Sequence, residues 1–139
     1  MFNVALKQIM TSPVETIRSD DSFSRVAEKF ERKGIRHLPV VDHQDCLIGL
    51  VTQRDLYRVY SPRMTDDGYF YDPEQLNKFI LARVMAHDPF FMGPDERLSE
   101  AIKIMAARKY GCIPIVDADR HVIGIITEID VLKYLGRLL

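Results

Sequence analysis

Cysteine, long apolar runs and an excess of charge of either sign are all scarce in this 139-residue sequence. Its two cysteines, Cys46 and Cys112, are isolated and form no Cys-x-x-Cys pattern, which favours a reducing compartment and argues against a structural zinc site. The apolar runs are too short to span a bilayer, and residues 1–7 lack the features of a signal peptide. We therefore expect a cytoplasmic protein with no membrane partner.

The charge is balanced as well as small, with 19 basic and 20 acidic residues and a net charge of −1. Residues 1–72 carry 10 basic and 11 acidic groups, and residues 73–139 carry 9 of each. Neither half has the basic excess that is typical of nucleic-acid binding, so this class of function is disfavoured. The hydrophobic fraction of 47% is ordinary for a globular protein with a core.

Motifs of catalysis are missing too. The sequence has no Gly-rich phosphate loop and no nucleophile elbow, so we expect no enzyme activity. The histidines have no metal-ligand spacing among themselves, and we predict no metal site. We interpret His43 and His121 as solvated turn residues, and Cys112 as a buried, inert thiol.

One pattern of residues occurs twice, 75 positions apart, in residues 49–56 and 124–131. Each copy reads Gly, two aliphatic residues, Thr, two variable residues, Asp and an aliphatic residue, which predicts a buried strand that runs into a helix. In one interpretation, the Thr and the Asp only cap the helix, since their spacing is that of a near capping box. Alternatively, the helix N-terminus and the Thr bind a phosphate while the Asp holds a neutral diol.

The repetition extends beyond this junction. Residues 36–58 and 111–133 align without a gap and share seven identities: Pro39/Pro114, Val41/Val116, Asp42/Asp117, Ile48/Ile123, Gly49/Gly124, Thr52/Thr127 and Asp55/Asp130. We infer a true internal repeat, in which each half of the chain is half of one structure.

Each half shows the same predicted order of elements. The periodicity predicts a short helix at residues 6–10 and 81–85, an extended segment at 14–17 and 90–92, and a longer amphipathic helix that runs toward Gly34 or Gly111. The faces of the longer helices carry Phe23, Val26, Ala27 and Phe30, and Leu98, Ala101, Ile102 and Met105. Two strands follow, at 38–42 and 47–51 and at 113–117 and 122–126, and the Pro in the first strand of each pair suggests an edge strand or a strand start.

Residues 60–72 have no counterpart in the other half. Pro, Gly and paired Asp predict a loop, and Asp72 followed by Pro73 predicts the start of the next helix. The loop contains four aromatic residues, which pack it onto the body or, alternatively, form a gate over a ligand site.

Both halves carry two signatures of the CBS domain family, named after cystathionine β-synthase. The first is a Pro-aliphatic-aliphatic-Asp strand (Leu38 to Asp42 and Ile113 to Asp117), and the second is the Gly-to-Asp junction at 49–55 and 124–130. The chain therefore resembles a CBS pair, or Bateman module, over nearly its whole length except the aromatic loop. The resemblance implies a mixed α/β (α+β) fold of two β-α-β-β-α repeats that pack through their strands about a pseudo-two-fold axis, with repeat 1 at 1–59 and repeat 2 at 73–139.

The resemblance also implies two clefts for an adenosine-containing ligand. In similar modules the junction Thr contacts phosphate, the junction Asp holds the ribose hydroxyls, and residues around the Pro-containing strand line the adenine pocket. The residues implied for the first cleft are Thr52, Asp55, Ile35, His37, Pro39 and Val14. Those implied for the second cleft are Thr127, Asp130, Tyr110, Cys112, Pro114 and Phe90.

The two clefts differ in charge. Arg54 lies in the first junction, whereas Glu128 lies in the second, and a cation near a helix N-terminus favours phosphate while a carboxylate opposes it. We predict that the first cleft takes the more highly phosphorylated ligand; alternatively, Arg54 lies in solvent.

The expected function is a regulatory module that binds AMP, ADP or ATP, needs no cofactor, forms a homodimer and signals to an effector protein. S-adenosylmethionine or another adenosyl ligand, and a purely structural dimerising role, are the alternatives.

Overall fold

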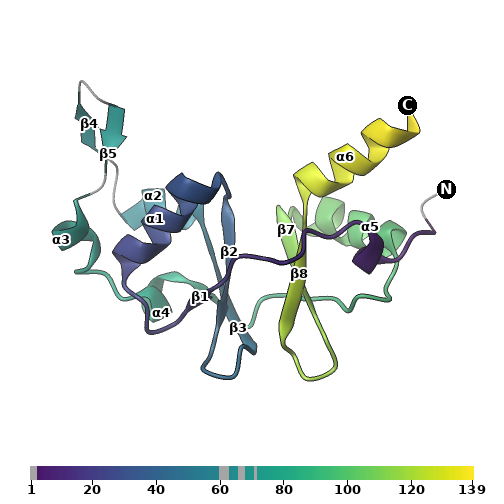
Figure 1. Ribbon diagram of the computed structural model, residues 1–139, viewed down its shortest axis with the longest axis horizontal. Helices are drawn as coiled ribbons and strands as arrows, with labels where there is room; N and C mark the ends of the chain where they lie inside the picture. The colour runs from purple at the N-terminus through teal and green to yellow at the C-terminus, as the bar shows by residue number, and fades with distance from the viewer. Residues whose placement is uncertain (1–2, 60–62, 66–67, 71) are drawn as a thin grey trace. The chain divides into compact units, whose positions relative to one another are not determined.

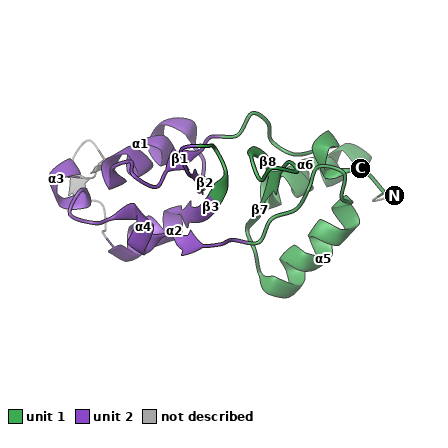
Figure 2. Ribbon diagram, turned by 90° about the horizontal axis from the view of Figure 1, so that it is seen from below, with its two compact units in different colours: residues 1–14, 44–47, 90–139 green, residues 15–43, 48–89 purple. Residues whose placement is uncertain are grey.

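The computed structural model describes residues 3–59, 63–65, 68–70 and 72–139. The chain forms two compact units that do not coincide with the two halves of the sequence, as Figure 2 shows. Unit 1 comprises residues 1–14, 44–47 and 90–139, and unit 2 comprises residues 15–43 and 48–89. No helix within the described ranges is long and apolar enough to cross a membrane.

Unit 2 contains a four-stranded sheet in the order β1-β2-β3-β6, of which Figure 1 labels β1, β2 and β3. The strands are β1 (Ile17–Arg18), β2 (His37–Val41), β3 (Leu47–Thr52) and β6 (Ala86–His87). Strand β1 runs parallel to β2, and β6 is antiparallel to β3, with Gly49 opposite His87. A strand from the beginning of the second repeat therefore completes the sheet of the first.

Four helices complete this unit: α1 (Phe23–Lys33), α2 (Gln53–Val59), α3 (Pro73–Leu76) and α4 (Leu81–Val84). The hydroxyl of Ser22 caps α1 by accepting from the Arg25 N–H at 3.3 Å, and Gly34 ends the helix with a φ of 63°. The four apolar residues predicted for the face of α1 are all buried, which confirms the periodicity. They pack in one core with side chains of β2, β3 and α4.

Unit 1 is built on the hairpin of β7 (Cys112–Val116) and β8 (Val122–Thr127), with Pro114 opposite Ile125. Its helices are α5 (Leu98–Arg108), α6 (Glu128–Leu138) and the 3-10 turn η1 (Leu6–Gln8). Leu6 is fully buried in this core, and its N–H donates to the Glu96 carbonyl at 2.8 Å. Here the N-terminal segment completes the second repeat, so the exchange of segments is mutual.

A methionine and a glycine meet where each exchanged segment lies on a hairpin. A Cβ added to Gly49 would lie 2.5 Å from the Met85 Sδ and 3.0 Å from the Ala86 carbonyl oxygen. A Cβ added to Gly124 would overlap the Met10 Sδ and lie 2.9 Å from its Cγ. The glycine in each junction pattern thus leaves room for the methionine of the other repeat. The sequence did not predict this exchange.

Several local predictions need correction. Helix α5 ends at Lys109, whose φ is 57°, before the predicted Gly111. Strand β2 lies between β1 and β3 and is not an edge strand. Proline has no backbone N–H to donate, but β1 pairs only with Val40 and Val41 of β2. Pro39 therefore leaves no hydrogen bond to β1 unformed. The extended segment predicted at residues 90–92 forms one parallel bridge, between Met92 and Ile115.

The predicted loop at 60–72 contains a short hairpin of β4 (Arg63–Thr65) and β5 (Gly68–Phe70). The four aromatic residues suggested as a gate lie outside the residues and side chains that the structure describes. The Asp72 carboxylate accepts from the Glu74 N–H at 3.0 Å, which confirms the predicted helix start at Pro73.

Candidate ligand-binding junctions

The first junction lies where β3 passes into α2. Thr52 donates to the Asp55 Oδ2 through its backbone N–H at 2.8 Å and its hydroxyl at 3.0 Å. The Asp55 N–H donates back to the Thr52 Oγ1 at 3.2 Å. This is the reciprocal capping box that the spacing predicts. Both side chains are half-buried, so solvent still reaches them.

The second junction, where β8 passes into α6, repeats this geometry. Thr127 donates to the Asp130 Oδ2 at 2.9 and 3.1 Å, and the Asp130 N–H donates to the Thr127 Oγ1 at 3.3 Å. In both junctions the cap uses only one carboxylate oxygen of the Asp. The other oxygen, Oδ1, is left as an acceptor, which suits a ligand that donates through hydroxyl groups.

The two junctions differ at this second oxygen. The Thr11 hydroxyl donates to the Asp130 Oδ1 at 2.8 Å. The residue 75 positions later is Ala86, which has no hydroxyl, and no group of the described residues hydrogen-bonds the Asp55 Oδ1. We did not single out Thr11 from the sequence. The signal for it was its alignment with Ala86, directly after the repeated methionines.

The residues predicted around the first junction belong to β2 and the turn before it. The Gln53 N–H donates to the Arg36 carbonyl at 2.9 Å and holds the start of β2 beside the junction. Ile35 and His37 are half-buried there, and Pro39 is buried within the strand. Arg54 is exposed on α2 and forms no ion pair with any described residue. Val14 belongs to unit 1, so its contact with a ligand at this junction stays a prediction.

The second junction is bordered in the same way, since the Glu128 N–H donates to the Gly111 carbonyl at 3.2 Å. Tyr110 and Phe90 are half-buried, and their ring centroids lie 6.0 Å apart. The Arg108 guanidinium lies 5.3 Å from the centroid of the Phe90 ring. The structure thus brings two predicted wall residues together and adds a cation that the sequence did not predict.

Cys112 and Pro114 are buried in β7 and border this junction from within the strand. Burial raises the pKa of the Cys112 thiol to about 12, and the Glu128 carboxylate adds to the rise. The thiol is therefore protonated at neutral pH and is a weak nucleophile. The predicted burial of Cys112 is confirmed, and its low reactivity stays a prediction.

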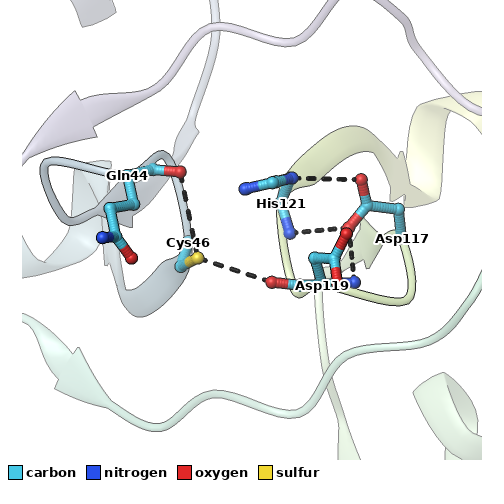
Figure 3. Close-up of polar contacts among 5 residues, drawn as sticks. All are labelled: Gln44, Cys46, Asp117, Asp119 and His121. Carbon is cyan, nitrogen blue, oxygen red and sulfur yellow. Dashed lines mark hydrogen bonds and ion pairs between the residues drawn. The ribbon is translucent and has the colours of Figure 1, made fainter.

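A cluster of possible metal ligands lies in the turn between β7 and β8 (Figure 3). Ligand atoms of Asp117, Asp119 and His121 lie within 4.8 Å of one another. The Asp117 Oδ1, however, accepts from the N–H groups of Asp119 and His121, both at 2.9 Å, and its Oδ2 lies 3.3 Å from the His121 Nδ1. The His121 side chain is 43% exposed, in line with the expected solvated turn residue, but the sequence did not predict its contact with Asp117.

These contacts explain the charge state of Asp117 without an ion. Partial burial is the largest single influence and raises its pKa. The two backbone N–H groups and the His121 ring together outweigh it and hold the pKa below the usual value. The cluster is accounted for as a turn that its own hydrogen bonds stabilise.

The tip of the first hairpin joins the same turn in unit 1. The Leu47 N–H donates to the Arg120 carbonyl at 3.0 Å, and the Val122 N–H donates to the Asp45 carbonyl at 3.3 Å. The two bonds correspond to each other at the 75-residue offset, since Leu47 is equivalent to Val122 and Asp45 to Arg120. The Cys46 Sγ lies 3.4 Å from the Asp119 carbonyl oxygen (Figure 3).

Comparison with known protein families finds a match in each half of the chain. The family model of the CBS domain matches residues 6–62 and again residues 81–137. The chain belongs to the CBS domain family. A CBS domain-containing protein of Dictyostelium discoideum is 30% identical over 142 residues, which cover 98% of this chain and 94% of that protein. The homoserine O-acetyltransferase of Methanococcoides burtonii is 28% identical, and this CBS pair spans 25% of its length.

Solved structures confirm the tandem α+β fold. The CBS domain pair of protein MJ0100, in complex with 5′-methylthioadenosine and S-adenosyl-L-methionine, has a TM-score of 0.80 at 23% identity, with 98% of each chain covered. CBSX2 in complex with AMP has a TM-score of 0.79 at 22% identity, with 96% of this chain and 97% of that chain covered. Structural neighbours of this CBS pair therefore include proteins that bind adenosine-type ligands.

Proposed function

We propose that this CBS pair is a regulatory module that binds an adenosine-containing ligand, AMP, ADP or ATP, at its Thr–Asp junctions. The observation that carries the proposal is the Asp55 carboxylate, whose Oδ2 is held by Thr52 while its Oδ1 remains available as an acceptor. A fixed carboxylate oxygen of this kind suits the hydroxyl groups of a ribose. The ligands in the MJ0100 and CBSX2 complexes support the same ligand class.

The phosphate preference follows from the charges beside each junction. Arg54 is exposed next to Asp55 and available to a phosphate, whereas the exposed Glu128 opposes an anion beside Asp130. The Asp55 junction therefore takes the more highly phosphorylated nucleotide. A ligand with a positive sulfonium, such as S-adenosylmethionine, fits the Glu128 side better, and this is the second candidate ligand.

Calorimetric titration of the purified protein with AMP, ADP, ATP and S-adenosylmethionine tests this proposal. Asp55→Ala is expected to remove most of the ADP and ATP binding, and Asp130→Ala to remove less. Glu31→Ala, which removes an exposed carboxylate on α1, is the matched control. A greater loss of ADP or ATP affinity in Asp130→Ala than in Asp55→Ala would contradict the assignment of the two junctions.

A regulatory module transmits ligand binding to another protein. We propose that this CBS pair does so as a homodimer that contacts an effector protein. Helix α6 has no buried residue, and Ile129, Leu132 and Leu138 are 51%, 61% and 49% exposed. Such exposed apolar side chains along one helix favour contact with a second copy of the chain. Binding of nucleotide then biases the conformation that the effector recognises.

Sedimentation equilibrium checks the dimer. Leu132→Lys is expected to shift the protein to monomer, whereas Lys133→Ala, on the adjacent exposed position, is expected to leave the dimer intact. A wild-type protein that is monomeric at all concentrations would refute this assembly. Location in the cytoplasm and the lack of nucleic-acid binding remain predictions.

A further inference from the structure

The Thr11 hydroxyl is the feature that distinguishes the ribose acceptors of the two junctions. It reaches the Asp130 Oδ1 at 2.8 Å from a segment 119 residues away in the sequence. This bond is not part of the helix cap, because Thr127 already holds the other oxygen of the carboxylate. A carboxylate oxygen has two lone-pair positions, so Thr11 occupies one of the two acceptor positions left on Oδ1.

The position of Thr11 is fixed by its backbone and by its neighbour. The Thr11 N–H donates to the Ile125 carbonyl at 2.9 Å, and the Ile125 N–H donates back to the Thr11 carbonyl at 3.1 Å. The Ser12 hydroxyl donates to the Ile123 carbonyl at 2.9 Å. These bonds hold the segment along β8, so the Thr11 side chain starts close to Asp130 at little cost in conformational entropy.

We propose that Thr11 is a specificity-determining residue that lowers the affinity of the Asp130 junction for a ribose with two free hydroxyl groups. The diol must displace the Thr11 hydroxyl or share the oxygen with it. Ala86 stands at the equivalent place beside Asp55 and offers no competing donor. The Asp55 junction is thus the principal site for the diol. This inference rests on the proposed function and concerns the sugar, whereas the contrast of Arg54 and Glu128 concerns the phosphate.

The test isolates the second junction in the Asp55→Asn background and measures AMP binding by calorimetry. Replacing Thr11 by Val removes the hydroxyl and keeps the side-chain volume. Because a competing hydrogen bond to a carboxylate is lost, AMP affinity is expected to rise about three- to tenfold. The rise is expected to be absent with 2′,3′-dideoxyadenosine monophosphate, which has no diol, and Thr11→Ser is expected to restore the lower AMP affinity.

Two further variants make the test specific. Ser12→Ala loosens the same segment without touching Asp130, so it controls for a general effect on the segment. In the Asp130→Asn background, Ala86→Thr places a hydroxyl beside Asp55 and is expected to lower AMP affinity by a similar factor. A fall or no change in AMP affinity in Thr11→Val, while AMP still binds, would overturn this inference alone. No AMP binding by the wild-type protein or by any variant would overturn the proposed function with it.

Discussion

Substituting Gly124 by Ala tests the exchange of segments between the two repeats. The three atoms nearest to the added Cβ all belong to Met10, a half-buried side chain from the N-terminal segment. Overpacking of this kind lowers the free energy of unfolding by about 1–3 kcal/mol. Because the far end of Met10 can swing aside, we expect a loss near the lower limit, about 1 kcal/mol.

Gly49→Ala is expected to cost more. Its added Cβ meets the buried Met85 and also the Ala86 carbonyl oxygen, at 3.0 Å. A backbone oxygen cannot rotate away as a side chain can, so the expected loss is about 2–3 kcal/mol.

Urea unfolding of double variants separates these effects. In a Met10→Ala background the clash at Gly124 is gone, and Gly124→Ala is expected to stabilise the protein by about 0.5 kcal/mol because alanine restricts the unfolded chain. In a Met85→Ala background Gly49→Ala remains destabilising, because the Ala86 carbonyl is still in place. A cost for Gly124→Ala that is the same with and without Met10 would refute the contact between these residues.

Three further predictions concern single side chains. Ser22→Ala removes the cap of α1 and is expected to lower the free energy of unfolding by about 1 kcal/mol in urea titrations. At pH 8 a thiol reagent is expected to label Cys46 much faster than Cys112 in mass-spectrometric time courses, because burial raises the pKa of Cys112 to about 12; equal rates would contradict this. The pKa of Asp117 is lowered on folding, so its contribution to stability is complete above the ordinary value of 3.8 and disappears as the pH falls through the lower folded value. Asp117→Asn, which does not titrate, is expected to lose less stability than the wild type between pH 4 and 2 in acid unfolding.

The sequence predicted the elements of this fold well because their signals are local. The repeated Gly-to-Asp pattern correctly placed both strand-to-helix junctions, and Thr52 and Thr127 form the expected capping boxes. Gly34 ends α1 as predicted, since left-handed positions depend on neighbouring residues.

The mutual exchange of segments was not predictable in the same way, because it depends on contacts between residues far apart in the chain. Nothing near Met10 in the sequence indicates that its partner is Gly124. The same holds for the hydrogen bond between Thr11 and Asp130, because these residues lie 119 positions apart in the sequence. The sequence also did not predict the contact between the His121 ring and the Asp117 carboxylate, because histidines in turns usually face only solvent.

Titration of the wild-type protein and of Asp55→Ala with AMP tests the central claim most directly. The account predicts saturable binding of AMP to the wild-type CBS pair and a large loss of affinity in Asp55→Ala, while Glu31→Ala binds as the wild type does. A folded, ligand-free protein that binds none of AMP, ADP, ATP and S-adenosylmethionine would contradict the account. Thr52 and Asp55 would then serve only as a helix cap.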